Sequence, residues 1–178
     1  MRLHKTVNVL FIAVGYILVT GFELSAQTIV AGVFLYICFG ILMYGGLYSF
    51  NSVADRVRDH KNGLPNPLYK LSLAEVLLHA CVAFVFVVLG QTLISIYFRQ
   101  IVYICFVLIG INLVYSFVLK RYFMIGGVLL IATTGPLKVM SGVLLAGGNV
   151  YDYWWIFIVH YVGSVIFHGV KNYRRGLL

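Results

Sequence analysis

The fold of this chain is decided by apolar runs such as "LSLAEVLLHACVAFVFVVLGQTLI", residues 71–94. A helix needs about 20 mostly apolar residues to cross the hydrocarbon core of a membrane. Five further stretches qualify or nearly qualify: 7–22, 28–50, 101–119, 123–145 and 154–170. Because lipid offers no partners to backbone N–H and C=O groups, these stretches predict helices. We expect an all-α, polytopic membrane protein with about six transmembrane helices in one domain, residues 1–178.

The composition and the placement of charge support the same fold. The chain is 62% hydrophobic and 10% charged, whereas a soluble domain is about one quarter charged. Eleven of its thirteen lysines and arginines lie before the first span or after the second, fourth and sixth: Arg2, Lys5, Arg56, Arg58, Lys61, Lys70, Lys120, Arg121, Lys171, Arg174 and Arg175. The positive-inside rule makes these segments, and therefore both termini, cytoplasmic. This pattern explains the net charge of +8 without a nucleic-acid partner.

The longest polar stretch is "NSVADRVRDHKNGLPNP", residues 51–67. If the second helix continues past Phe50, then Asn51, Asp55 and Asp59 recur at every fourth residue. Each step of four rotates by only about 40°, so the three side chains form one stripe. One carboxamide and two carboxylates suit Mg²⁺, which prefers one or two carboxylates plus substrate phosphates to a complete protein cage. The stripe therefore predicts a magnesium site.

Basic residues alternate with these acids. Arg56, Arg58 and Lys61 are placed where they could balance the charge of a bound phosphate. The alternative is a solvated loop in which the two aspartates merely pair with neighbouring arginines, since exposed ion pairs are common and weak.

Two segments resemble a known family. Asn-x-x-x-Asp-x-x-x-Asp between the second and third helices resembles the first aspartate-rich motif of the UbiA-type intramembrane prenyltransferases. That motif usually reads Asn-Asp-x-x-Asp-x-x-x-Asp, followed closely by an asparagine and a proline. Asn62 and Pro65 follow here, and Ser52 replaces the second-position aspartate. The segment "YSFVLKR", residues 115–121, is similar to the Tyr-(Ser/Thr)-x-x-Leu-Lys-Arg segment that joins the family's fourth and fifth helices.

The resemblance implies a Mg²⁺-dependent transferase. Such an enzyme moves an isoprenyl group from a prenyl diphosphate to an aromatic or other lipophilic acceptor within the membrane. The resemblance implies that Asp55 and Asp59 are catalytic and that both bind the metal together with Asn51. The residues that it implies for binding the diphosphate are Asn51, Arg56, Tyr115, Lys120 and Arg121.

The chain departs from the family after the sixth predicted helix. The family has a second aspartate-rich motif there, roughly Lys-Asp-Tyr-x-x-Asp, followed by three more helices. This chain has "VKNYRRGLL", residues 170–178, with Asn172 where the first aspartate would stand. We therefore expect a UbiA-like bundle that lacks the last three helices. Three hypotheses stay open: a prenyltransferase that needs a second copy or a second chain, a non-catalytic membrane partner or binding protein, and a small transporter.

The fifth predicted helix contains a break and a lysine. Gly135 and Pro136 are expected to kink or break the helix, with Thr133 and Thr134 satisfying the freed backbone groups. Lys138 follows this break by two residues. It either faces a polar cavity or extends toward the membrane surface.

Four other ionisable residues lie inside predicted spans. Glu75 and His79 are four residues apart, which favours a local pair over a role in positioning an acceptor. His160 and His168 share one side of the sixth helix and are expected to be packed and hydrogen-bonded, because no third metal ligand is evident. Aromatic residues such as Tyr44 suit the membrane interface.

Overall fold

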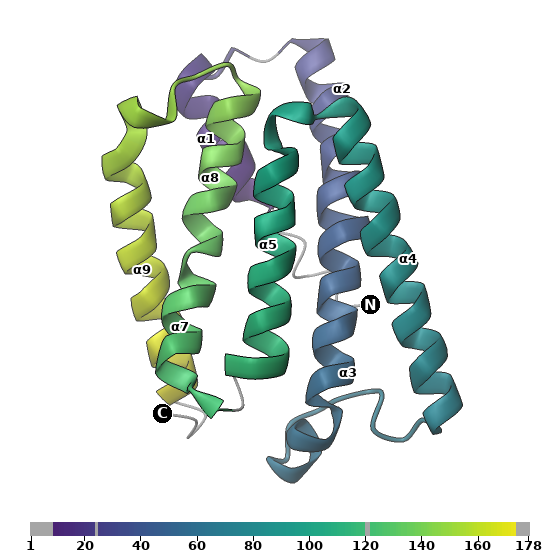
Figure 1. Ribbon diagram of the computed structural model, residues 1–178. Helices are drawn as coiled ribbons and strands as arrows, with labels where there is room; N and C mark the ends of the chain where they lie inside the picture. The colour runs from purple at the N-terminus through teal and green to yellow at the C-terminus, as the bar shows by residue number, and fades with distance from the viewer. Residues whose placement is uncertain (1–8, 24, 120–121, 174–178) are drawn as a thin grey trace.

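The computed structural model describes residues 9–23, 25–119 and 122–173, and within these ranges it is a helical bundle without strands (Figure 1). The α-helices are α1 (Leu10–Thr20), α2 (Ala26–Leu35), α3 (Gly45–Lys61), α4 (Leu73–Tyr97), α5 (Val102–Val114), α7 (Met124–Ala132), α8 (Thr134–Leu145) and α9 (Trp154–Tyr173). Among the described residues, five helical segments are long and apolar enough to cross a membrane, and α1 is a shorter apolar helix. The predicted all-α membrane fold is confirmed.

The longest helical segment, Ala26–Lys61, continues well past residue 50, where the apolar run ends. It consists of α2, a π-helical stretch at Tyr36–Tyr44, and α3, without a break between them. Its 36 residues span about 54 Å, which exceeds a hydrocarbon core of about 30 Å. The polar end of α3 therefore extends beyond the apolar layer. Asn51, Asp55 and Asp59 all belong to this helix, so they do share one stripe.

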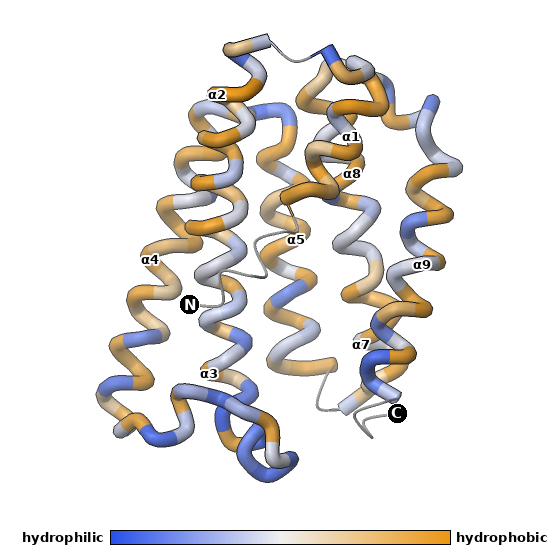
Figure 2. The backbone as a smooth tube through the Cα atoms, turned by 180° about the vertical axis from the view of Figure 1, so that it is seen from behind, coloured by the Kyte–Doolittle hydropathy of each residue, from blue (hydrophilic) through white to orange (hydrophobic). Residues whose placement is uncertain are grey.

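The connections alternate between the two ends of the bundle. The α3–α4 loop, the end of α5 and the end of α9 lie at one end, and the α1–α2, α4–α5 and α8–α9 connections lie at the other (Figure 1). Hydrophilic residues gather along the α3–α4 loop, while the helices are mostly hydrophobic (Figure 2). The end that carries the α3–α4 loop is the one that the charge pattern predicts to be cytoplasmic.

Small residues allow the helices to pack closely. A Cβ atom on Gly15 of α1 would collide with the backbone of Val139 in α8, and one on Gly142 of α8 would collide with the backbone of Ile12. Gly46 of α3 similarly lies against the backbone of α4. Close backbone approach at glycines is a common way for membrane helices to associate, because lipid provides little hydrophobic force between them.

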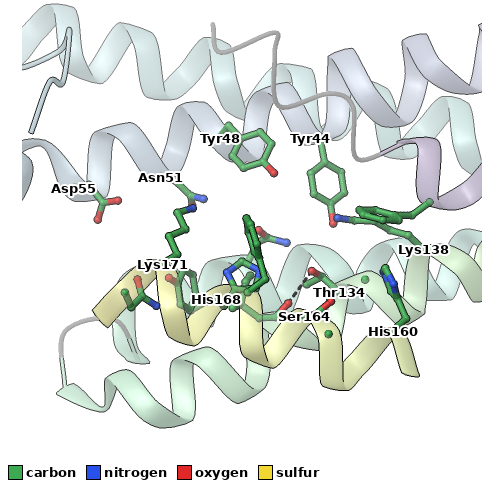
Figure 3. Close-up of a pocket in the computed structure, with 18 of the residues that line it drawn as sticks. Tyr44, Tyr48, Asn51, Asp55, Thr134, Lys138, His160, Ser164, His168 and Lys171 are labelled. Carbon is green, nitrogen blue, oxygen red and sulfur yellow. Dashed lines mark hydrogen bonds between the residues drawn. The ribbon is translucent and has the colours of Figure 1, made fainter. Parts of the chain in front are cut away.

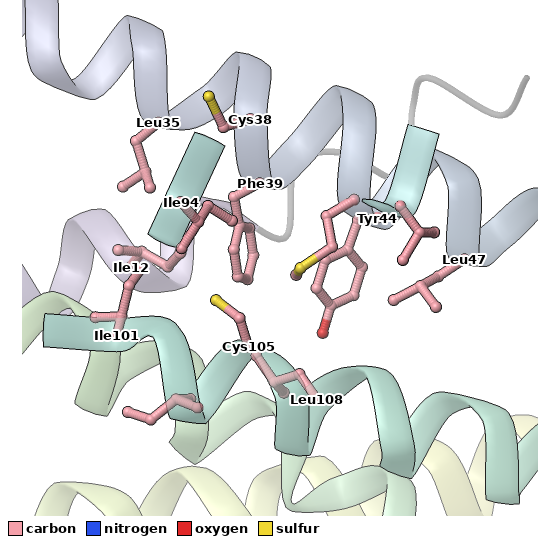
Figure 4. Close-up of a cluster of buried hydrophobic side chains, with 13 residues drawn as sticks. Ile12, Leu35, Cys38, Phe39, Tyr44, Leu47, Ile94, Ile101, Cys105 and Leu108 are labelled. Atoms are coloured by element: carbon pink, nitrogen blue, oxygen red, sulfur yellow. The ribbon is translucent and has the colours of Figure 1, made fainter. Parts of the chain in front are cut away.

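Apolar side chains lie both in the interior of the bundle and on its outside. A buried cluster joins α1, α2, the π-helical stretch, α3, α4, the 3-10 turn Arg99–Ile101 and α5 (Figure 4). Its members include Ile12, Leu35, Cys38, Phe39, Tyr44, Leu47, Ile94, Ile101, Cys105 and Leu108. In contrast, Leu78 and Phe84 of α4 are 65% and 60% exposed. Large apolar side chains on the outside of a helix are expected where lipid is the solvent.

The break between α7 and α8 is confirmed. α7 ends at Ala132 and α8 begins at Thr134. The hydroxyl of Thr133 donates to the carbonyl of Leu130, and the hydroxyl of Thr134 donates to that of Ile131, each at 2.7 Å. The backbone N–H of Thr133 also donates to the carbonyl of Leu130, at 3.1 Å, so the two hydroxyls add second donors at the break.

The predicted pairing of Glu75 with His79 is wrong. One carboxylate oxygen of Glu75 accepts hydrogen bonds from the backbone N–H of Ser72 at 2.7 Å and from its hydroxyl at 2.8 Å. The Ser72 hydroxyl in turn accepts from the backbone N–H of Glu75, which completes a capping box at the start of α4. The first N–H groups of a helix have no partner within it, so Glu75 serves the helix terminus rather than the next turn.

Candidate functional site

A cavity of about 1070 Å³ opens between α3, α5, α8 and α9. Apolar and aromatic side chains make up part of its wall: Phe11, Tyr44, Tyr48, Ile131, Ile156, Val159 and Phe167. Polar residues from several helices complete it, with Asn51, Asp55, Lys138, His160 and Lys171 among them (Figure 3). A large hollow that combines an apolar and aromatic lining with convergent polar groups has the character of a ligand site.

The predicted stripe on α3 lines this cavity. Asn51, Asp55 and Asp59 are all part of its wall, at the end that the α3–α4 loop covers. Asp55 is only 9% exposed, and one of its carboxylate oxygens accepts from the guanidinium of Arg58 at 2.5 Å. The α-helical rise puts Asn51 and Asp59 about 12 Å apart along the axis, with Asp55 midway. Asp55 can therefore share a cation with either neighbour.

Tertiary contacts hold the two outer residues of the stripe. The hydroxyl of Ser116, 65 residues away, donates to the side-chain carbonyl of Asn51. The side-chain amide of Asn66 donates to Asp59 at 3.0 Å and to the backbone carbonyl of Ser52 at 2.9 Å. The α3–α4 loop is thus folded back onto the helix face that carries the carboxylates.

The basic residues of this segment take different positions. The guanidinium of Arg56 donates to the backbone carbonyl of Leu71 at 2.8 Å and lines a second hollow, together with Arg58 and Lys61, rather than the cavity. One residue along a helix rotates by about 100°, so Arg56 cannot face the same way as Asp55. Helical geometry applied to the sequence would have indicated this separation.

Of the residues taken from the second motif, Tyr115 lies in the cavity wall. It begins a π-helical turn at the end of α5, Tyr115–Leu119. Lys120 and Arg121 lie outside the described residues.

The last helix contributes residues that the sequence analysis did not assign to the site. Lys171 extends from α9 across the cavity toward Asn51, and Asn172 is buried beside it (Figure 3). The side-chain nitrogen of Asn172 has no hydrogen-bond partner among the described residues. His160 and His168 also line the cavity, and Lys171 follows three residues later. Because residues three apart in a helix are neighbours, extending the two-histidine face would have found Lys171.

The side chains of the stripe fit Mg²⁺ only if substrate phosphates supply some of its ligands. Within residues 9–23, 25–119 and 122–173, no three His, Cys, Asp or Glu side chains converge as a metal cluster. Two carboxylates and one carboxamide oxygen on a single helix face are instead what Mg²⁺ uses when substrate phosphates complete its shell. Each carboxylate has about four lone-pair sites, so the contacts with Arg58 and Asn66 leave Asp55 and Asp59 capacity for a cation.

Comparison with known proteins identifies the family. The model of the UbiA prenyltransferase family matches residues 8–175. Neither the comparison with curated proteins nor that with solved structures found a match. The family match covers nearly the whole chain and includes the α3 stripe, the segment at Tyr115 and all of α9 within the described residues. This chain therefore belongs to the UbiA prenyltransferase family.

Proposed function

We propose that this protein binds a prenyl diphosphate in the cavity and transfers the prenyl group to an aromatic or other lipophilic acceptor. The observation that carries the proposal is the position of Asn51, Asp55 and Asp59 on one wall of a cavity of about 1070 Å³ whose other walls combine apolar and aromatic side chains with polar ones. Such a site holds a charged head group at one end and a hydrocarbon tail along the rest. Family membership supports a prenyltransferase-like activity in general.

The α3 stripe would hold Mg²⁺, as family members generally do. When bound, Mg²⁺ supplies positive charge that neutralises the departing diphosphate. Asp55 and Asp59 provide carboxylate oxygens, and Asn51 provides a carbonyl oxygen whose direction the Ser116 hydroxyl fixes. A carboxylate held in place by a second hydrogen-bonded side chain is better oriented for metal binding, and Asn66 has this role for Asp59.

Lys171 faces the stripe from the opposite helix (Figure 3). We assign its ammonium group to the diphosphate, whose oxygens would lie between α3 and α9. Arg56 binds the α3–α4 loop backbone instead, so the proposal gives it no contact with substrate. Lys120 and Arg121 stay candidates for the diphosphate, on the family motif alone.

The apolar wall has a chemical task of its own. Loss of diphosphate leaves positive charge on the allylic carbon of the prenyl group, and water would capture it. Apolar side chains of the cavity wall, Ile131, Val159 and Phe167 among them, would exclude water from that carbon. Excluding water from a reactive intermediate is a recognised contribution of closed sites. On the charge pattern, we place the stripe at the cytoplasmic face, where a water-soluble diphosphate head group is accessible.

The test is binding of a labelled prenyl diphosphate to the purified protein, with and without Mg²⁺. Asp55→Asn and Asp59→Asn should each weaken Mg²⁺-dependent binding by about 100-fold, since each removes a charged metal ligand. Asp152→Asn is the matched control, because Asp152 is exposed near the opposite end of the bundle. Equal binding by all four proteins would refute the metal site. Product formation with an added acceptor then separates a transferase from a protein that only binds.

A further inference from the structure

The second hollow, of about 540 Å³, shares no lining residue with the cavity, and we call it the outer hollow. It lies between α3, the first turn of α4 and the π-helical turn that follows α5. Its lining residues are Val53, Ala54, Arg56, Val57, Arg58, Lys61, Val76 and Phe117. The described wall thus combines three cations with apolar side chains and includes no acidic residue.

Helical geometry separates the outer hollow from the α3 stripe. Val53, Val57 and Lys61 each follow a member of the stripe by two residues. Two residues rotate by about 200°, so these three side chains run along nearly the opposite face of α3. Asp55 and Asp59 accordingly line the cavity and not the outer hollow. α3 therefore presents acids to the cavity and cations to its other side.

Protein contacts hold both arginines at the outer hollow. The guanidinium of Arg56 donates to the backbone carbonyl of Leu71 at 2.8 Å. A guanidinium carries five N–H groups in a planar fork, so this contact leaves Arg56 donors for a ligand. Arg58 forms its ion pair with Asp55, which answers its charge. The excess charge of the hollow therefore comes from Arg56 and from the third cation, Lys61.

Acids of the described part of the chain leave that excess charge in place. Arg56 and Lys61 form no ion pair with an acid among the described residues. Lys61 is exposed at the last residue of α3. Glu75 of α4 is held by Ser72 in the capping box. The outer hollow is therefore a basic site.

The outer hollow lies where the apolar spans meet the polar end of the bundle. Val76 belongs to the start of α4 and Phe117 to the end of the α5 segment, both at the end that carries the α3–α4 loop (Figure 1). Large apolar side chains at and beside the hollow are exposed, among them Val57, Leu77 and Phe117. Such side chains face lipid in a membrane protein. The apolar part of the hollow thus borders acyl chains, while its cations stand at the level of the head groups.

An anionic phospholipid matches both parts of the outer hollow. Its head group brings negative charge to Arg56 and Lys61, and its acyl chains continue along Val57 and Phe117. Basic pockets between transmembrane helices on the cytoplasmic side are typical sites for anionic head groups. A free phosphate would use the cations alone and leave the apolar side chains without a partner.

We propose that the outer hollow binds the head group of an anionic phospholipid in preference to a zwitterionic one. The site lies outside the cavity, so it goes beyond the proposed prenyl transfer and does not rest on it. The bound head group joins α3 to the start of α4 and the end of α5, the three segments that line the hollow.

The test compares two phospholipids that differ in head-group charge. Dioleoyl phosphatidylglycerol and dioleoyl phosphatidylcholine are titrated onto the purified, delipidated protein in detergent, and native mass spectrometry gives the dissociation constant of the first bound lipid. Each of the two cations without an acidic partner contributes about fivefold, so the wild type should bind phosphatidylglycerol at least about tenfold more tightly. Equal affinity for the two lipids would overturn the proposal.

A lysine pair locates the preference in the molecule. Lys61→Met keeps the length of an exposed side chain and removes its charge, and it should lower the preference about fivefold. Lys70→Met is the matched control, because Lys70 is exposed in the α3–α4 loop but does not line the outer hollow. It should retain the preference. An equal loss in both variants, or a full preference in Lys61→Met, would assign the effect to net charge and overturn the site.

A soluble competitor distinguishes a lipid from a free phosphate. sn-Glycerol 3-phosphate in about tenfold excess should leave phosphatidylglycerol bound, because the apolar side chains of the hollow contribute to lipid binding. Displacement of the lipid would make a soluble phosphate the occupant and refute the proposal.

Asp59→Asn separates the outer hollow from the metal site. This variant should lose Mg²⁺-dependent binding of prenyl diphosphate and keep the preference for phosphatidylglycerol. If the wild type binds no prenyl diphosphate yet prefers the anionic lipid, the proposed function fails and the lipid site stands. If it binds the diphosphate without preferring the anionic lipid, the reverse is true.

Discussion

The cavity has one polar end on α3, where Asn51, Asp55 and Asp59 share a helix face, and another where Lys138, Tyr44 and His160 come from three helices. At the α3 end every member of the stripe has a protein partner, through Ser116, Arg58 and Asn66. At the Lys138 end, the Tyr44 hydroxyl and His160 Nε2 have none among the described residues.

This difference indicates two kinds of ligand group. Carboxylates held by neighbouring donors suit a cation, because each oxygen can accept from a donor and still bind a metal. The two unsatisfied polar atoms at the Lys138 end suit instead a ligand group that can hydrogen-bond to them. The most informative experiments therefore disrupt one end of the cavity, by mutation or chelation, and measure ligand binding at the other end.

Removal of metal should give the largest difference between the two ends. EDTA is expected to weaken prenyl diphosphate binding by about 100-fold and to leave binding of 4-hexylphenol, an aromatic probe whose hydroxyl can hydrogen-bond, unchanged. The measurement is equilibrium binding of both probes to one protein preparation, with Mg²⁺ added back as the control. Equal loss of both would show that the two ends are not independent.

Gly135→Leu should damage the Lys138 end. Its new side chain would collide with His160 and Ser164, and overpacking of this kind costs about 1–3 kcal/mol. We expect a lower thermal unfolding temperature in detergent and weaker binding of 4-hexylphenol. Gly110→Leu is the matched control, because a Cβ at that exposed position of α5 meets nothing within 4 Å. Unaltered stability in both variants would contradict the close approach of α8 and α9.

Asn66→Ala should weaken Mg²⁺ binding at the α3 stripe by about tenfold. The change removes the donor that orients Asp59 and ties the α3–α4 loop to the backbone of Ser52, and such supporting residues commonly contribute 10- to 100-fold to metal affinity. The readout is the Mg²⁺ concentration that half-saturates diphosphate binding. Asn62→Ala, exposed at the end of α3, should leave this concentration unchanged.

Ser116→Ala should have the smallest effect on diphosphate binding at the α3 stripe. It deletes one hydrogen bond to Asn51, for which about 1 kcal/mol, or roughly fivefold in diphosphate affinity, is expected. Ser95→Ala, which loses only a bond to the Gln91 carbonyl of its own helix, is the comparison. A drop as large as that of Asn66→Ala would mean that Asn51 contributes more than a neutral ligand normally does.

The sequence by itself determined the membrane fold and the α3 stripe. Both depend on residues that are near each other in the chain: a span is an uninterrupted apolar run, and the stripe follows from a spacing of four in a helix. The break at Gly135 and Pro136 was predictable for the same reason. The family resemblance added the meaning of the stripe, which spacing alone left open between a metal site and a solvated loop.

Only the tertiary structure decided what stands opposite that stripe. The sequence alone predicts an interfacial position for Tyr44 and leaves two positions open for Lys138, because the local sequence does not show which helix packs against either residue. The family resemblance implies Arg56 as a diphosphate ligand, and the structure shows its guanidinium bound to the backbone carbonyl of Leu71. Contacts between residues as far apart as Ser116 and Asn51 depend on how whole helices pack. That packing places Lys138, His160 and Lys171 in one cavity with the carboxylates.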